Sequence, residues 1–148
     1  MRERWRASIG LGAALRDLGR LDEAEPMLRR ALEQAPNFPS DPVGAIARAQ
    51  LELGRLELAR GRVAAAEPLL AAAERTYWQR SPHAKEAGRS KLWLAICRAR
   101  MGRTSEAETL LRSAAEIFGK THPPSHPERR RVDEELQRLR GGAGAAAS

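Results

Sequence analysis

The sequence predicts an all-α fold, a solenoid of three helix pairs followed by a C-terminal capping helix. Three segments are nearly the same in sequence, and the glycines that open them are spaced by 42 and then 41 residues: 19–34, 61–76 and 102–117. A repeat of this length indicates one supersecondary unit stacked on copies of itself. Only six of the 148 residues are aromatic, which suits closely packed helices better than sheets.

In each copy, apolar and small residues recur three and four positions apart, both after the glycine and in the stretch before it. This spacing places them on one face of a helix, so each repeat is expected to hold two helices. The repeats are expected at about 5–38, 42–79 and 83–119. Glycine adopts the left-handed backbone at little cost, so the helix-ending turns are expected at Gly19, Gly61 and Gly102. A small residue in each second helix suits a close helix crossing: Ala24, Ala66 and Ala107.

The linkers between repeats carry residues that start helices. Asp41 is a predicted N-cap with Pro42 in the first turn, and Ser81–Pro82 repeats the arrangement before the third pair. After the third pair, apolar residues recur at intervals of four and three in a capping helix at about 127–140. Residues 141–148 are expected to be a disordered tail. We therefore expect a single repeat domain over residues 1–140.

Several residues of the first copy together resemble one complete tetratricopeptide repeat: Leu11, Gly12, Leu15, Leu18, Gly19, Arg20, Ala24, Leu28, Ala31 and Pro36. The other two copies keep most of these positions, and the resemblance covers about residues 5–119. The long period looks like the kinesin-light-chain type of array, often found in bacterial multi-domain signalling proteins. The resemblance implies a right-handed solenoid in which the first helix of each pair lines a concave groove. The chain departs from the pattern at Glu57 and Arg98, which occupy the slot that Leu15 fills in the first copy.

Composition excludes several classes of protein. No stretch approaches the roughly 20 uninterrupted apolar residues that a membrane-spanning helix needs. The arginine-rich start precedes a short apolar run that Arg16 and Asp17 interrupt, so we expect no signal peptide. The single cysteine, Cys97, cannot form an internal disulfide, so a reducing cytoplasm is the expected location.

Charge is the feature that points to a partner. The formal net charge is +7, and residues 81–148 carry +5 of it (13 basic minus 8 acidic). Counting one face of the first helices places six arginines toward the groove that the resemblance implies: Arg6, Arg16, Arg48, Arg55, Arg89 and Arg100. One aliphatic residue lies beside them in each repeat: Ile9, Leu51 and Leu92. Arginine binds carboxylates with two parallel hydrogen bonds, so we expect an acidic peptide segment of a partner protein to bind there.

Two other functions use the same features. The chain could be a regulatory or self-association segment of a larger bacterial signalling protein, such as a kinase or transcription regulator, pairing through its first helix. Nucleic-acid binding through Arg129, Arg130 and Arg131 is a third reading, which the acidic residues on the same helix disfavour. The arginines could also simply be solvated or paired with local glutamates. Chaperone tails are not expected partners, because Ile9, Ala13 and Glu52 stand where the family's dicarboxylate clamp uses a lysine and asparagines.

Catalytic chemistry has little support. The chain has no phosphate-binding loop or nucleophile elbow, so we expect neither enzyme activity nor a cofactor. His122 and His126 lie in a linker, and the sequence suggests no cysteine or well-placed carboxylate that would complete a metal site. Cys97 is expected to be a small buried residue. The three tryptophans are expected to be packing residues: Trp5, Trp78 and Trp93.

Overall fold

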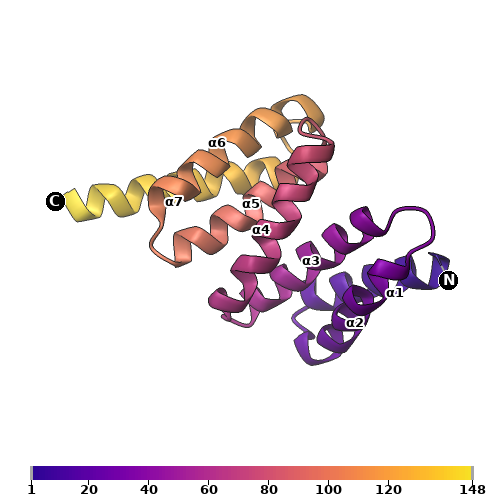
Figure 1. Cartoon of the computed structure of the whole chain (residues 1–148). Coiled ribbons are helices and arrows are strands. Elements are labelled where there is room, and N and C mark those ends of the chain that lie inside the picture. The colour runs from indigo at the N-terminus through magenta and orange to yellow at the C-terminus, as the bar shows by residue number, and fades with distance from the viewer. Residues whose placement is uncertain (1, 148) are drawn as a thin grey trace. The chain divides into compact units, whose positions relative to one another are not determined.

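The structure is a computed structural model that describes residues 2–147 (Figure 1). Within that range the chain is all helical, as predicted, with no strand. Its elements are α1 (Arg2–Asp17), α2 (Leu21–Gln34), the short 3-10 helix η1 (Ala35–Asn37), α3 (Pro42–Ala59), α4 (Val63–Arg80), α5 (Lys85–Arg100), α6 (Thr104–Thr121) and α7 (Pro127–Ala147). The three predicted helix pairs are therefore α1–α2, α3–α4 and α5–α6.

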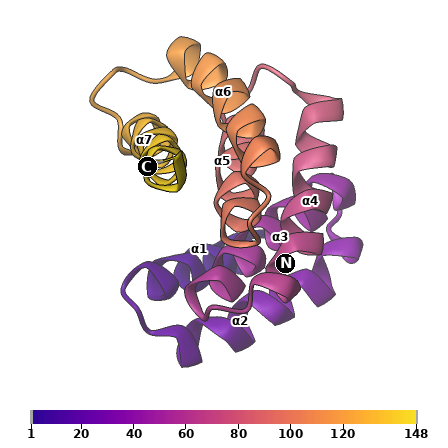
Figure 2. The same ribbon diagram turned by 90° about the vertical axis from the view of Figure 1, so that its left-hand side faces the viewer.

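Contacts divide the chain into two compact units, residues 1–76 and 77–148, with the boundary inside α4. In the first unit α1 packs on α2, and both contact α3. In the second unit α5 packs on α6, and α7 lies against both (Figure 2). Elements of a repeat array contact mainly their neighbours, which is why each unit has a core of its own.

The turn inside each helix pair is the same in all three copies, and it confirms the prediction made for the glycines. The glycine has a positive φ in each case: 79° at Gly19, 76° at Gly61 and 79° at Gly102. The residue after it donates its amide hydrogen to a carbonyl five positions earlier: Arg20 to Leu15, Arg62 to Glu57 and Arg103 to Arg98, at 2.8–2.9 Å. This is the Schellman arrangement, which satisfies carbonyls that the ending helix leaves unpaired.

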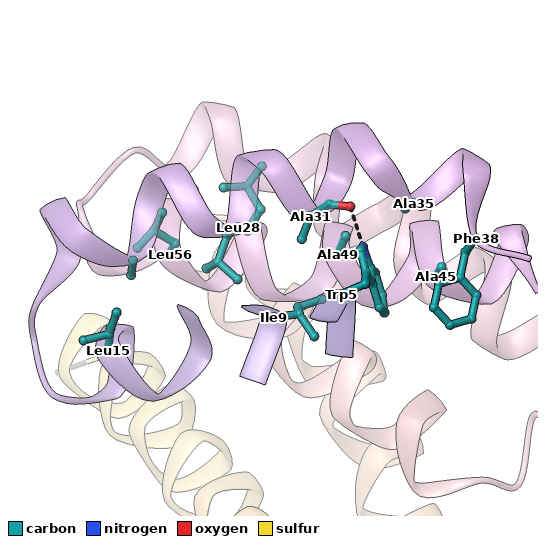
Figure 3. Close-up of a cluster of buried hydrophobic side chains, with 12 residues drawn as sticks. Trp5, Ile9, Leu15, Leu28, Ala31, Ala35, Phe38, Ala45, Ala49 and Leu56 are labelled. Atoms are coloured by element: carbon teal, nitrogen blue, oxygen red, sulfur yellow. Dashed lines mark hydrogen bonds between the residues drawn. The ribbon is translucent and has the colours of Figure 1, made fainter. Parts of the chain in front are cut away.

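The core of the first unit lies where α1, α2 and α3 meet (Figure 3). In the first two helix pairs, α1–α2 and α3–α4, the helices approach closely because a glycine of the first helix faces a leucine of the second. A Cβ atom on Gly12 would lie 2.8 Å from Leu28 Cδ2, and one on Gly54 would lie 2.7 Å from Leu70 Cδ2. The alanines predicted at close crossings are all fully buried: Ala24, Ala66 and Ala107.

Large and small side chains exchange places between the first and third pairs. Trp5 is buried in α1 and donates its indole N–H to the carbonyl of Ala31, at 2.9 Å (Figure 3). Gly88 occupies the equivalent position in α5, 83 residues later, where a Cβ atom would lie 2.6 Å from Phe118 Cε1. The ring of Phe118 therefore takes space that the backbone of Gly88 leaves open.

Two boundaries differ from the prediction. Asp41 caps α3 as expected, accepting from the amide of Gly44 at 3.0 Å, but Ser81–Pro82 does not start the next helix. Residues 81–84 instead form a turn closed by Ala84 N–H on the carbonyl of Ser81, so α5 begins at Lys85. The C-terminal helix α7 is longer than the predicted 127–140. It runs through Ala147, over a stretch of three glycines and four helix-favouring alanines; Ser148 lies outside the described residues.

Three predictions about single residues have mixed outcomes. Cys97 is buried, as expected of a small core residue. Trp5 is a packing residue as well. Trp78 is not, because it is 46% exposed and Lys91 Nζ lies 4.0 Å from its ring centroid. Helical spacing alone did not distinguish a core tryptophan from one at the surface.

Candidate functional site

Arg6 and Arg48 are the predicted site residues that remain at the surface of the first unit. Both are exposed, and their guanidinium groups flank a buried aromatic pair. Arg6 lies 5.8 Å from the ring centroid of Phe38, and Arg48 lies 6.0 Å from that of Trp5. The two rings are 5.0 Å apart. Cation–π contacts of this kind hold a guanidinium in position while leaving its N–H groups available.

Arg16 has a different role from the one predicted. Its side chain is buried and donates to the backbone carbonyl of Glu52 at 3.2 Å, and it also bonds the Glu52 carboxylate and Asp17. Arg55 joins the same group, with guanidinium nitrogens 3.9 Å from carboxylate oxygens of Asp17 and Glu52. These contacts connect α1 to α3, so Arg16 holds two helices together and does not face a partner.

The three aliphatic residues predicted beside the arginines are in the core. Ile9 is 0% exposed, Leu51 is 2% and Leu92 is 1%. A partner's side chains cannot reach them without unfolding the helices that cover them. The expectation that they accept apolar side chains is therefore wrong. A count along one helix does not show which neighbouring helices cover a position, and Ile9 lies in the buried cluster that α1 forms with α2 and α3.

Arg89 and Arg100 belong to the second unit. Arg89 makes a two-pronged contact with Glu128 of α7, with Nε and Nη2 each 2.8 Å from a carboxylate oxygen. Burial alone would raise the pKa of Glu128, but the hydrogen bonds and charge of Arg89 outweigh it and lower that pKa below its usual value. Arg89 is thus engaged in docking α7 on α5. Arg100 is exposed near the end of α5.

The histidines of the last linker lie at the same junction. The rings of His122 and His126 stack 3.8 Å apart with planes within 5°, and His122 also stacks on Phe118 at 4.8 Å. His126 Nδ1 accepts the amide hydrogen of Glu128, at 3.1 Å. Burial, and then the neighbouring charge of His126, lowers the pKa of His122.

A carboxylate does lie near the two histidines, which the sequence analysis did not foresee. One atom from each of His122, His126 and Glu128 lies within 4.8 Å of the other two. A metal ion binds in the plane of an imidazole ring, and two parallel stacked rings have no common in-plane point between them. Both oxygens of Glu128 are also occupied by Arg89. In this conformation the cluster packs the α6–α7 junction and does not present converging ligands.

The structure resolves the two departures from the repeat pattern. Glu57, in the slot of Leu15, is buried but lies 3.2 Å from Arg29 Nη2 and 3.6 Å from Arg62 Nη1. Arg29 comes from α2, so a basic residue of the preceding helix compensates the buried carboxylate. Arg98, in the same slot of the third copy, is partly exposed and lies 3.8 Å from Glu106. Arg29 and Glu57 are 28 residues apart, so no local sequence pattern indicates that they pair.

None of the helices in the described range is both long and apolar enough to cross a membrane.

Two overlapping stretches of the chain, residues 6–80 and 51–121, each match a family profile described as "Tetratricopeptide repeat". The chain is similar to the crystal structure of nearly identical TPR-like repeats assigned to a kinesin light chain of Podosopora anserina. That match has 26% sequence identity and a TM-score of 0.80, and it covers 97% of this chain and 69% of the other. A variant of the same repeats gives 27% identity and a TM-score of 0.78, with coverage of 95% and 67%.

No curated protein matches the chain significantly in sequence. The family profile, the helix pairs and the repeated glycine turns nevertheless agree. This chain belongs to the tetratricopeptide repeat family.

Proposed function

We propose that this chain binds an acidic segment of a partner protein at the surface of its first unit, through Arg6 and Arg48. Tetratricopeptide repeats generally mediate protein–protein interactions and are typically scaffolds without enzyme activity. The proposal narrows that general role to one surface and one class of partner. It rests on the two exposed arginines that flank the Trp5–Phe38 pair.

The aromatic pair supports the proposal because it limits the motion of both guanidinium groups. A long side chain that is already held in place loses less entropy on binding. Each guanidinium can then bind a carboxylate with two parallel hydrogen bonds. Trp5 is itself fixed by its hydrogen bond to Ala31, so the platform under Arg48 is rigid. The other four predicted arginines leave the proposal: Arg16, Arg55 and Arg89 contact carboxylates of this chain, and Arg100 belongs to the second unit.

Internal contacts of the C-terminal arginines favour a protein partner over nucleic acid. Arg129 donates to the carbonyl of His122 at 2.9 Å. Arg131 pairs with Glu135 at 2.9 Å and lies 5.6 Å from the ring centroid of Trp93. Two members of the basic triplet are thus engaged inside the second unit. A phosphate-binding surface would need them turned outward.

The test is a double charge reversal, Arg6→Glu with Arg48→Glu. A second double variant, Arg75→Glu with Arg130→Glu, changes the net charge equally at exposed positions elsewhere. Binding is measured by titrating fluorescent glutamate-rich and lysine-rich peptides at physiological salt. We expect the glutamate-rich peptide alone to bind, the first variant to lose at least tenfold in affinity and the second to change less than twofold. Equal losses in both variants, or none in the first, would contradict the proposal.

A further inference from the structure

The outer side of α1 carries an apolar stripe that solvent reaches. Ala7, Leu11, Ala14 and Leu18 are spaced by four, three and four residues, which places them along one side of the helix. Leu11 is 50% exposed and Leu18 is 72% exposed, and both alanines are exposed. Large exposed aliphatic side chains in a row are uncommon on a solvated helix and mark a contact surface.

The corresponding residues of the second repeat show what packs on this side of a first helix. The equivalent positions of α3, 42 residues later, are Ala49, Leu53, Leu56 and Arg60. Arg60, in the place of Leu18, pairs with Asp22 and Glu25 of α2, while the other three are buried. They belong to the core cluster in which α3 packs against the preceding pair. The side of α1 therefore has the pattern of a surface that another helix covers.

The rim of this side differs from that of α3 in one respect. A hollow of about 790 Å³ opens between α1 and α2, with Arg4 and Arg30 among its lining residues. The equivalent residues of the second repeat are Ile46 and Ala72. Two arginines at the rim suit a partner that carries acidic groups beside its apolar ones.

The outer side of α1 is complementary to itself. We propose that two copies of this chain associate through α1, antiparallel and related by a two-fold axis near residues 12 and 13. In this register Leu11 faces the partner subunit's Ala14, and Ala7 faces the partner subunit's Leu18. Each leucine meets an alanine, so the two helices pack closely without a clash or a gap.

Charge favours the same direction. Residues 2–6 hold three arginines and one glutamate, a balance of +2 (3 minus 1). Residues 17–23, at the other end of α1 and the start of α2, hold three acidic residues and one arginine, a balance of −2 (1 minus 3). An antiparallel pair brings each basic end beside the partner's acidic end, whereas a parallel pair would juxtapose like charges. This surface is distinct from the proposed peptide site, since Arg6 lies about a third of a turn around α1 from the stripe.

The first test is the mass of the protein in solution as a function of concentration. Sedimentation should give the single-chain mass of 16.3 kDa at low concentration and approach twice that value at high concentration. Leu11→Glu with Leu18→Glu should remain at the single-chain mass with an unchanged circular dichroism spectrum, since both side chains are exposed. Val43→Glu, at another exposed aliphatic residue (54%), is the matched control and should associate like the parent.

The second test fixes the orientation. A mixture of the Ala7→Cys and Leu18→Cys variants should form a disulfide-linked heterodimer on mild oxidation, while neither variant alone should link to itself. The native Cys97 is buried and does not compete. A single-chain mass at every concentration, association that survives Leu11→Glu with Leu18→Glu, or self-linking of the Ala7→Cys variant would each overturn the proposal. The first outcome would instead leave the stripe to a different partner helix.

Discussion

The contact between Arg89 and Glu128 provides a decisive prediction, because it separates a structural role for Arg89 from a binding role. Arg89→Glu should loosen α7 from α5 and destabilise the second unit. The charge swap Arg89→Glu with Glu128→Arg should recover at least half of the loss, since it restores an ion pair of opposite polarity. Arg48→Glu, at an exposed arginine whose contact is with a ring, should cost less than about 1 kcal/mol.

The magnitude follows from the geometry. Hydrogen bonds to charged groups contribute about 1.5–3 kcal/mol each when well buried. The side chains of Arg89 and Glu128 are 28% and 19% exposed, so solvent screens them, and we take about 1–2 kcal/mol for the pair. Arg89→Glu also places two carboxylates close together, and repulsion between partly exposed charges about 4 Å apart adds about 1–4 kcal/mol. The two contributions together give an expected loss of about 2–6 kcal/mol.

The assay combines urea denaturation with amide hydrogen exchange resolved by segment. Exchange should accelerate in α7 and little in α1 or α2. The fluorescence of Trp93 should change as well, because Arg131 of α7 lies over its ring. The reasoning is refuted if Arg89→Glu leaves exchange in α7 unchanged while it abolishes binding of acidic peptides. Arg89 would then belong to the binding surface, as the sequence alone suggested.

Three further predictions concern stability. Glu57→Leu should leave the free energy of unfolding unchanged or raise it by about 1 kcal/mol, because Arg29 and Arg62 keep Glu25 as an ion-pair partner. A Tm that falls by more than about 4 °C would show that the buried carboxylate is needed. A Cβ atom would meet no neighbour at either Gly61 or Gly10. Gly61→Ala should lower the free energy of unfolding in urea by about 1–2 kcal/mol because of its φ of 76°. Gly10→Ala, inside α1, should raise it by up to about 1 kcal/mol. Acidification should weaken the α6–α7 junction. The pKa of His122 is lower in the folded chain than in the unfolded chain, so on acidification this imidazole is protonated first in the unfolded chain. The stabilisation that neutral His122 contributes is therefore complete above about pH 6.5 and is lost as pH falls through the folded pKa. The protection of α7 amides, obtained by dividing the intrinsic exchange rate at each pH by the measured rate, should therefore fall between pH 7.5 and 5.5. A flat protection profile, or one that His122→Gln leaves unaltered, would contradict this.

What the sequence determined by itself is local. The three glycine turns, the helix-capping Asp41 and the pairing of helices within each copy follow from backbone preferences and from a helical period of 3.6 residues. These features depend on residues a few positions apart, and the 42- and 41-residue spacing repeats them three times. That repetition is why the fold and the family could be predicted without coordinates.

Which arginines are available was decided only by the tertiary structure. Arg16 binds a carboxylate 36 residues away, on Glu52, and Arg89 binds one 39 residues away, on Glu128. The aliphatic prediction failed for a related reason, because Ile9 is covered by neighbouring helices that a count along α1 cannot see. A charged side chain is engaged or exposed according to the helix packed beside it, and that neighbour comes from another part of the chain.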